Sequence, residues 1–133
     1  MSLERFSAPV ADEADLTWAI IQVGRLANEI GFKESGKSMV MTAASELGRN
    51  ILKYARRGTL VAEPIDTDIR KGIEIIVKDH GPGIENVKLA MQDTYSSGGT
   101  LGLGLPGVQR MMDEFHIDTA VGRGTIVTIR KWV

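Results

Sequence analysis

The chain has 133 residues, 43% hydrophobic and 25% charged, which suits one globular domain over residues 1–133 with a single core. Its formal net charge of −1 supplies no general basic field, so we expect neither a nucleic-acid nor a membrane partner. The absence of cysteine and of any apolar run approaching a membrane span excludes disulfides and favours a reducing, cytoplasmic location.

The first periodic segment predicts a helix that ends near residue 30. Its apolar residues recur at i, i+3, i+4 and i+7, the spacing of one helical stripe. Asp12 or Asp15 could cap its start, because a short acidic side chain accepts from free backbone N–H groups. The stripe consists of Leu16, Ala19, Ile20, Val23, Leu26, Ala27 and Ile30.

GFKESGKS, residues 31–38, fits the phosphate-binding pattern G-x-x-x-x-G-K-[ST]. That pattern binds phosphate where it follows a strand and opens a helix. Here it stands between the first predicted helix and a second one that runs to about Arg57. We therefore interpret it as a helix connector in which Gly31 ends one helix and Ser35 or Ser38 caps the next.

The second half of the chain changes to the period of strands. A third helix precedes the last two strands and is marked by Leu105, Val108, Met112 and Phe115, with Pro106 suited to its first turn. The predicted strands are LVAEPI with Pro64 near its end or on an edge, GIEIIVKD, two strands around a glycine-rich turn in residues 117–133, and a weaker one in ERFSAPV.

This order of elements predicts an α+β fold. Helices grouped with mainly antiparallel strands favour a two-layer α/β sandwich, with one mixed, mostly antiparallel sheet and the helices on one face. A cleft between the sheet and the helices is then the expected place for a site.

ELGRN, on the second predicted helix, offers the first candidate site residues. Glu46 and Asn50 lie four residues apart and so share a face at the border of the apolar stripe, with Lys53 beside them. A carboxylate there can accept a proton from a hydroxyl, and an amide oxygen can bind Mg²⁺. The alternative is an ordinary solvated helix edge.

DHGPG, residues 79–83, offers the second. Counting by two along the predicted strand places Asp79 on its buried face, where a carboxylate needs a partner. An adenine amino group would serve, and Gly81 and Gly83 would allow a flat ring to approach closely. The alternative is a turn that Asp79 begins and glycine and proline complete.

SSGGTLGLGLPG, residues 96–107, offers the third. Its glycines precede a predicted helix, and free N–H groups at a helix start suit phosphate oxygens. The stretch also contains G-x-G-x-x-G, but no strand precedes it and no acidic residue follows about 20 positions later, so a dinucleotide fingerprint is excluded. A plain flexible loop is the alternative.

Taken together, ELGRN, DHGPG and GGTLGLGL resemble the N, G1 and G2 boxes of the GHKL ATPase and kinase superfamily, whose members share the Bergerat sandwich. The resemblance spans about residue 12 to the end, and within it the short loop and the ending GRGTIVTIRKW are more similar to stressosome switch kinases than to anti-sigma-factor kinases. The resemblance implies ATP and Mg²⁺ as cofactors, Glu46 as general base, Asn50 as metal ligand, Asp79 as adenine partner, and Lys53, Gly81, Gly83, Gly98, Gly99, Thr100, Gly102, Leu103, Gly104 and Thr125 as further nucleotide-binding residues.

The resemblance also implies a function. We expect a serine/threonine protein kinase that phosphorylates STAS-domain scaffold or antagonist proteins and then activates a downstream effector, such as a phosphatase or another signalling enzyme. A nucleotide-gated binding module or anti-sigma factor is the second hypothesis, and an adaptor without nucleotide is the third. Few residues precede the first helix, which argues against an autophosphorylating histidine kinase.

Overall fold

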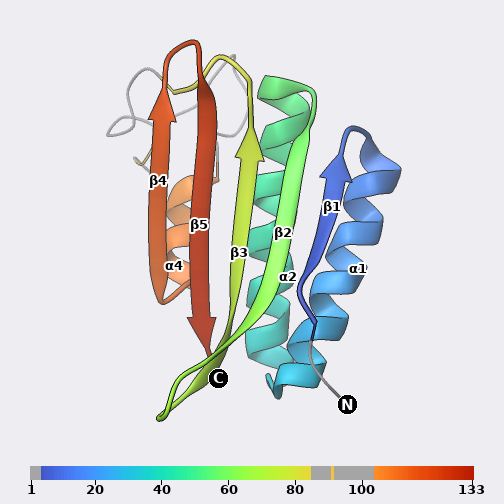
Figure 1. Ribbon diagram of the computed structural model, residues 1–133, viewed down its shortest axis with the longest axis vertical. Coiled ribbons are helices and arrows are strands. Elements are labelled where there is room, and N and C mark those ends of the chain that lie inside the picture. The colour runs from blue at the N-terminus through green and yellow to red at the C-terminus, as the bar shows by residue number, and fades with distance from the viewer. Residues whose placement is uncertain (1–3, 85–90, 92–103) are drawn as a thin grey trace.

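The computed structural model describes residues 4–84, 91 and 104–133. It is a two-layer sandwich in which one sheet is covered on one face by helices (Figure 1). The elements are β1 (Phe6–Val10), α1 (Glu13–Ile30), α2 (Glu34–Asn50), the π-helical turn η1 (Ile51–Ala55), β2 (Gly58–Asp66), β3 (Lys71–Asp79), α4 (Leu105–Met111), β4 (Glu114–Ala120) and β5 (Gly124–Trp132). The predicted α+β sandwich is confirmed.

The sheet has five strands in the order β1-β2-β3-β5-β4, and the four ladders between them are all antiparallel. Leu60 pairs with Val77, and Val77 pairs with Val127, so these side chains share one face. All three are buried, and this face turns toward the helices. The opposite face carries no helix among the described residues and is called here the open face.

One core fills the space between the sheet and the helices. Burial of these aliphatic side chains supplies the main stabilisation of the sandwich. The largest fully buried side chains come from the strands, the helices and η1, and they are Leu16, Leu47, Ile51, Leu60, Ile73, Ile75, Leu105, Ile129, Val10, Val23, Val40 and Val108.

Both ends of α1 lie where the sequence predicts them. The side chain of Asp12 caps its start by accepting from the backbone N–H of Asp15 at 2.8 Å. Gly31 ends it in the left-handed region at φ +115°, a conformation that glycine adopts without steric cost. The connector prediction for residues 31–38 is therefore confirmed, because a helix precedes this segment and α2 begins within it.

Two predicted details are wrong. Neither Ser35 nor Ser38 caps α2, because the helix already begins at Glu34 and Lys33 occupies the cap position without a side-chain bond. Phe115 belongs to β4 rather than to the third helix, which ends at Met111. The alternation of a strand and the apolar spacing of a short helix coincide at this boundary, so periodicity alone does not separate them.

The strand predictions are otherwise confirmed, including the weak one at the N-terminus. Pro64 pairs with Ile73 on β3, but β1 extends only as far as Ala62 along β2. Pro64 therefore lies on a locally free edge, where a residue without an N–H is tolerated. Pro106 occupies the first turn of α4, as predicted.

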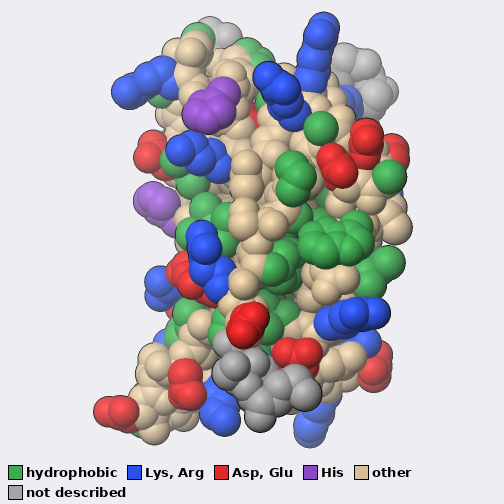
Figure 2. All heavy atoms as spheres, turned by 45° about the vertical axis from the view of Figure 1, so that its right-hand side comes forward, with side chains coloured by type: hydrophobic (Ala, Val, Ile, Leu, Met, Phe, Trp, Pro, Cys, Tyr) green, Lys and Arg blue, Asp and Glu red, His purple; other side chains and the backbone are tan. Residues whose placement is uncertain are grey.

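Charges of both signs are interspersed on the face in Figure 2.

The one buried charged side chain among the described residues is Glu74 on the open face, which accepts from Arg130 Nε at 2.6 Å. This hydrogen bond and the nearby carboxylate raise the pKa of Arg130. No helix in the described part of the chain is long and apolar enough to cross a membrane.

Candidate functional site

The C-terminal end of α2 presents Glu46 and Asn50 on one face, and both are half-buried. The helix then widens into the π-helical turn η1, which is followed by Arg56 with a φ of +72°. A π-helical turn and a non-glycine residue in the left-handed region are uncommon, and both are frequent at functional sites. This end of α2 is therefore the first place to look for a site.

Glu46 lies directly against the start of α4. A Cβ added to Gly104 would lie 2.5 Å from Glu46 Oε2, and Gly104 has a φ of +72°. Glycine thus meets two demands here, a left-handed backbone and the close approach of a carboxylate. The structure brings the first and third candidate segments together at this contact.

Asp79 stands at the end of β3 on the helix-facing side of the sheet, as predicted, and is half-buried. Its cross-strand partner on β5 is Thr125, and its Oδ1 accepts from the backbone N–H of Gly81 at 2.8 Å. The predicted site residues Asp79 and Thr125 are therefore neighbours. The turn that was the alternative for Asp79 is present, so one oxygen of the carboxylate has a structural role.

Gly81 and Gly83 fit this end of the sheet closely. A Cβ on Gly81 would lie 2.5 Å from the Cβ of Ala55 in η1. Gly83, at φ +78°, faces the backbone carbonyl of Ala120 so closely that a Cβ would collide with it. The two glycines pack the segment after β3 against η1 on one side and against the end of β4 on the other.

A small hydroxyl network supports Thr125. Its Oγ1 lies 2.8 Å from the Oγ1 of Thr119, which accepts from the backbone N–H of Ile84 at 2.9 Å. Thr119 also donates to the carbonyl of Gly124 at 3.0 Å. The network fixes the end of the β4–β5 hairpin beside Asp79 and was not predicted, because it depends on the register of two ladders.

Tyr54, in η1, is a candidate site residue that the sequence reasoning missed. Its hydroxyl is buried and has no hydrogen-bond partner, while Lys53 Nζ lies 5.1 Å from the centre of its ring. A buried unpaired hydroxyl is costly and indicates a missing partner such as water or a ligand. Its spacing of four residues from Asn50 was a usable signal, since that spacing continues the stripe of Glu46 and Asn50.

The remaining predicted site residues give less information about the site. Lys53 is exposed on η1. Of the residues predicted in the third segment, the structure describes Gly104. The others lie outside the described residues, and they are Gly98, Gly99, Thr100, Gly102 and Leu103. Among the described residues, no group of three or more histidine, aspartate or glutamate side chains could hold a metal ion.

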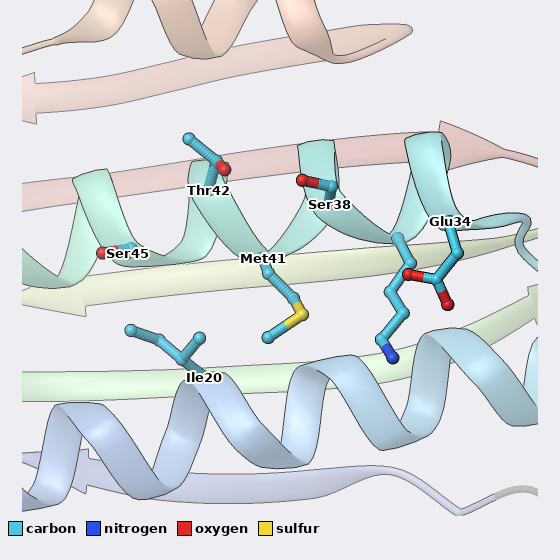
Figure 3. A pocket seen from close by; sticks show the side chains of 7 residues that line it. Ile20, Glu34, Ser38, Met41, Thr42 and Ser45 are labelled. Atoms are coloured by element: carbon cyan, nitrogen blue, oxygen red, sulfur yellow. The ribbon is translucent and has the colours of Figure 1, made fainter.

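The residues of the phosphate-loop-like string GFKESGKS lie away from the C-terminal end of α2. Lys37 and Ser38 line a groove of about 480 Å³ between α1 and α2, together with Ile20 and Met41 (Figure 3). Lys37 and Asn50 are separated along α2 by roughly 20 Å, from a rise of about 1.5 Å per residue. The groove is therefore distinct from the contact of Glu46 with Gly104 and from the packing of Gly81 against η1.

The fold places the chain among two-layer α+β sandwich domains with one antiparallel sheet. Residues 10–131 match the family described as "Histidine kinase-like ATPase domain", and the chain belongs to this family. The predicted GHKL membership is thereby confirmed.

Two curated relatives are similar to this chain over most of its length. The chain is 42% identical over 120 residues to the "Serine/threonine-protein kinase RsbT" of Bacillus subtilis (strain 168), covering 87% of this chain and 90% of that protein. It is 31% identical over 100 residues to the "Anti-sigma F factor" of Caldanaerobacter subterraneus subsp. tengcongensis, covering 71% of this chain and 68% of that one.

Solved structures support the fold. The RsbU and RsbW domains of Rv1364c from Mycobacterium tuberculosis align with a TM-score of 0.64 at 18% identity, over 96% of this chain and 31% of that one. The catalytic domain of the histidine kinase ThkA aligns with a TM-score of 0.59 at 13% identity, over 97% of each chain. At these identities the alignments show the sandwich architecture alone.

Proposed function

We propose that this chain is an ATP-dependent serine/threonine protein kinase that phosphorylates STAS-domain scaffold proteins and acts as a partner switch. The observation that carries the proposal is the contact of Glu46 with Gly104, which places a half-buried carboxylate at the start of α4. The extensive similarity to a serine/threonine kinase supports the same reading.

The described residues fit a nucleotide. Asp79 uses Oδ1 for the turn at Gly81, and its second carboxylate oxygen suits the amino group of adenine. Thr125 lies beside it in the ladder, and the buried hydroxyl of Tyr54 has a hydrogen bond to offer. The phosphates would be held by the glycine-rich segment with Gly98, Gly99, Thr100, Gly102, Leu103 and Gly104, and Lys53 would add positive charge.

In this proposal ATP would supply the phosphoryl group, and Asn50 would hold Mg²⁺ through its amide oxygen, so that the ion would neutralise phosphate charge. Glu46 accepts the proton of the attacking serine or threonine hydroxyl as the oxygen bonds to phosphorus and ADP leaves. Asp79 and Thr125 orient the adenine, so that positioning and charge stabilisation supply most of the rate enhancement.

The proposal includes the partners that the family resemblance implies. STAS-domain scaffold or antagonist proteins are the substrates, and their phosphorylation releases the kinase to activate a downstream effector, a phosphatase or another signalling enzyme. Residues 1–133 form one domain that carries both the ATP site and the surfaces for these partners.

The test is phosphoryl transfer to purified STAS proteins in the presence of labelled ATP and Mg²⁺. Transfer to serine or threonine that is lost in Glu46→Gln is the expected result. A wild-type protein that binds ATP but transfers no phosphate to any STAS protein would contradict the kinase assignment.

Similarity to an anti-sigma factor favours a second candidate function. In that case nucleotide binding controls partner choice, and catalysis is incidental. ATP would then change affinity for a protein partner in Glu46→Gln as much as in the wild type, whereas a switch driven by phosphorylation would stop in that variant.

A further inference from the structure

The two edges of the sheet are built differently. The free edge of β1 contains Pro9, which lacks the N–H that a further strand would need, and β1 has only five residues. At the opposite edge, β4 has seven residues and no proline. Within the described part of the chain, its one ladder partner is β5.

Next to this edge, along which no described residue forms a second ladder, the surface is hollowed. The hollow, of about 740 Å³, is lined by the end of α4, the turn after it, and the first half of β4, with Thr128 and Arg130 from β5. Met112 and Phe115 give it an apolar part, and Asp113 and Glu114 an acidic part. An unpaired edge beside a hollow favours the addition of a further strand.

We propose that the β4 edge joins two copies of this chain. In this dimer the two β4 strands run antiparallel around a two-fold axis that passes through Ile117 perpendicular to the sheet. Such an axis pairs residues of the same face with each other and keeps both helix layers on the same side.

The charges of β4 select this register. With the axis at Ile117, the numbers of any two paired residues add up to 234. His116 therefore faces the partner's Asp118, and every residue of β4 from Glu114 to Ala120 has a partner. Imidazole can donate an N–H to carboxylate whether it is neutral or charged. Moving the axis to His116 would place Glu114 opposite the partner's Asp118, and moving it to Asp118 would place two Asp118 carboxylates together.

An exposed apolar residue supports the same register. Val121, in the turn after β4, is 68% exposed. Continuing the pairing one step beyond the strand places it opposite the partner's Asp113, at the rim of the hollow that Met112 and Phe115 line. The hollow of each copy would then receive the turn of the other, which accounts for both features.

The first test is a charge exchange monitored by sedimentation equilibrium at concentrations up to about 100 µM. His116→Asp and Asp118→His each place like or unproductive groups opposite one another and should weaken association at least about tenfold. The double variant restores the pairs and should return to within about threefold of the wild type. Lys78→Glu, on the same face but away from the edge, is the matched control and should associate normally.

Each of these results decides the proposal once circular dichroism has verified folding. A wild type that stays monomeric throughout the range would overturn it. So would a double variant that associates as weakly as the single variants, because the register would then be wrong.

The second test uses cross-linking, since the chain has no native cysteine. Ile117→Cys places two thiols opposite one another at the axis, where directly paired Cβ atoms lie about 4.5–5.5 Å apart. Mild oxidation with copper phenanthroline should give a disulfide-linked dimer, while Ser7→Cys at the β1 edge should not. Equal cross-linking of the two variants would indicate random collision and contradict the proposal.

Discussion

The first turn of α2 and its last turns differ in what surrounds them. The first turn carries a complete phosphate-loop string, yet Lys37 faces a groove formed with α1. The last turns carry a short and common pair, Glu46 and Asn50, yet Gly104 contacts the carboxylate, and Gly81 packs against η1 just beyond. A motif thus gains meaning from the segments that reach it, and three weak motifs that converge outweigh one complete string that stands alone.

Glu46→Gln tests the proposed catalytic end of α2 and has the largest expected effect. A general base contributes about 10²- to 10⁴-fold to rate, so phosphoryl transfer should fall by that factor while Mg²⁺-ATP affinity stays nearly unchanged. Single-turnover transfer and calorimetric titration on the same preparation measure the two quantities. Glu34→Gln, at the other end of α2, is the control, and a wild-type rate in Glu46→Gln would remove the base assignment.

Asn50→Ala should lower both the rate of phosphoryl transfer and the affinity for Mg²⁺-ATP. If Asn50 holds Mg²⁺ as proposed, removing the amide oxygen would leave the phosphates less well neutralised and the transferring group misplaced. We expect rate and affinity to fall together, each by about tenfold or more. A variant that loses rate alone would show that Asn50 orients the substrate rather than the metal.

Asp79→Asn should weaken ATP by at least about fivefold, or ~1 kcal/mol, as loss of a charged hydrogen bond does. The amide oxygen of asparagine can still accept from Gly81, so the turn should persist and the loss would report on the nucleotide. Competition with GTP, which has no amino group at the equivalent position, gives a second readout. Equal affinity for ATP and GTP would speak against the adenine assignment.

Tyr54→Phe should separate stability from binding. Removing a buried hydroxyl that has no partner should leave the free energy of unfolding unchanged or raise it, because its desolvation penalty disappears. ATP affinity should nevertheless fall by about threefold if the nucleotide supplies the missing hydrogen bond. Urea unfolding without nucleotide and titration with it give the two values, and a large loss of stability would assign the hydroxyl to the fold.

Lys37→Ala tests the other end of α2 and should have the smallest effect. Because Lys37 lines the α1–α2 groove, ATP affinity should stay within about threefold of the wild type by calorimetry. A loss of tenfold or more would restore the phosphate-loop interpretation of residues 31–38.

The sequence predicts the helices well because their signals are local. The stripe from Leu16 to Ile30, the cap at Asp12 and the stop at Gly31 all lie within one segment, and each is observed. The start of α2 escaped prediction because Lys33 occupies the cap without a side-chain bond. The π-helical turn escaped because no local pattern distinguishes it from a continuing helix.

The candidate site was predictable as residue types but not as contacts. Asp79 could be placed on the buried face of its strand by counting in twos. Its pairing with Thr125 depends on the β3–β5 register, and the contact of Glu46 with Gly104 depends on how α4 packs against α2. Such contacts join residues far apart in the chain, which periodicity does not report.

The most direct test of where the nucleotide binds is an amide chemical-shift titration of the assigned protein with Mg²⁺-ATP. The largest shifts should appear at Asn50, Tyr54, Gly81 and Thr125, with little change from Gly31 to Ser38. Largest shifts at Gly31–Ser38, with the Asp79 region unchanged, would contradict the assignment of the site to the C-terminal end of α2.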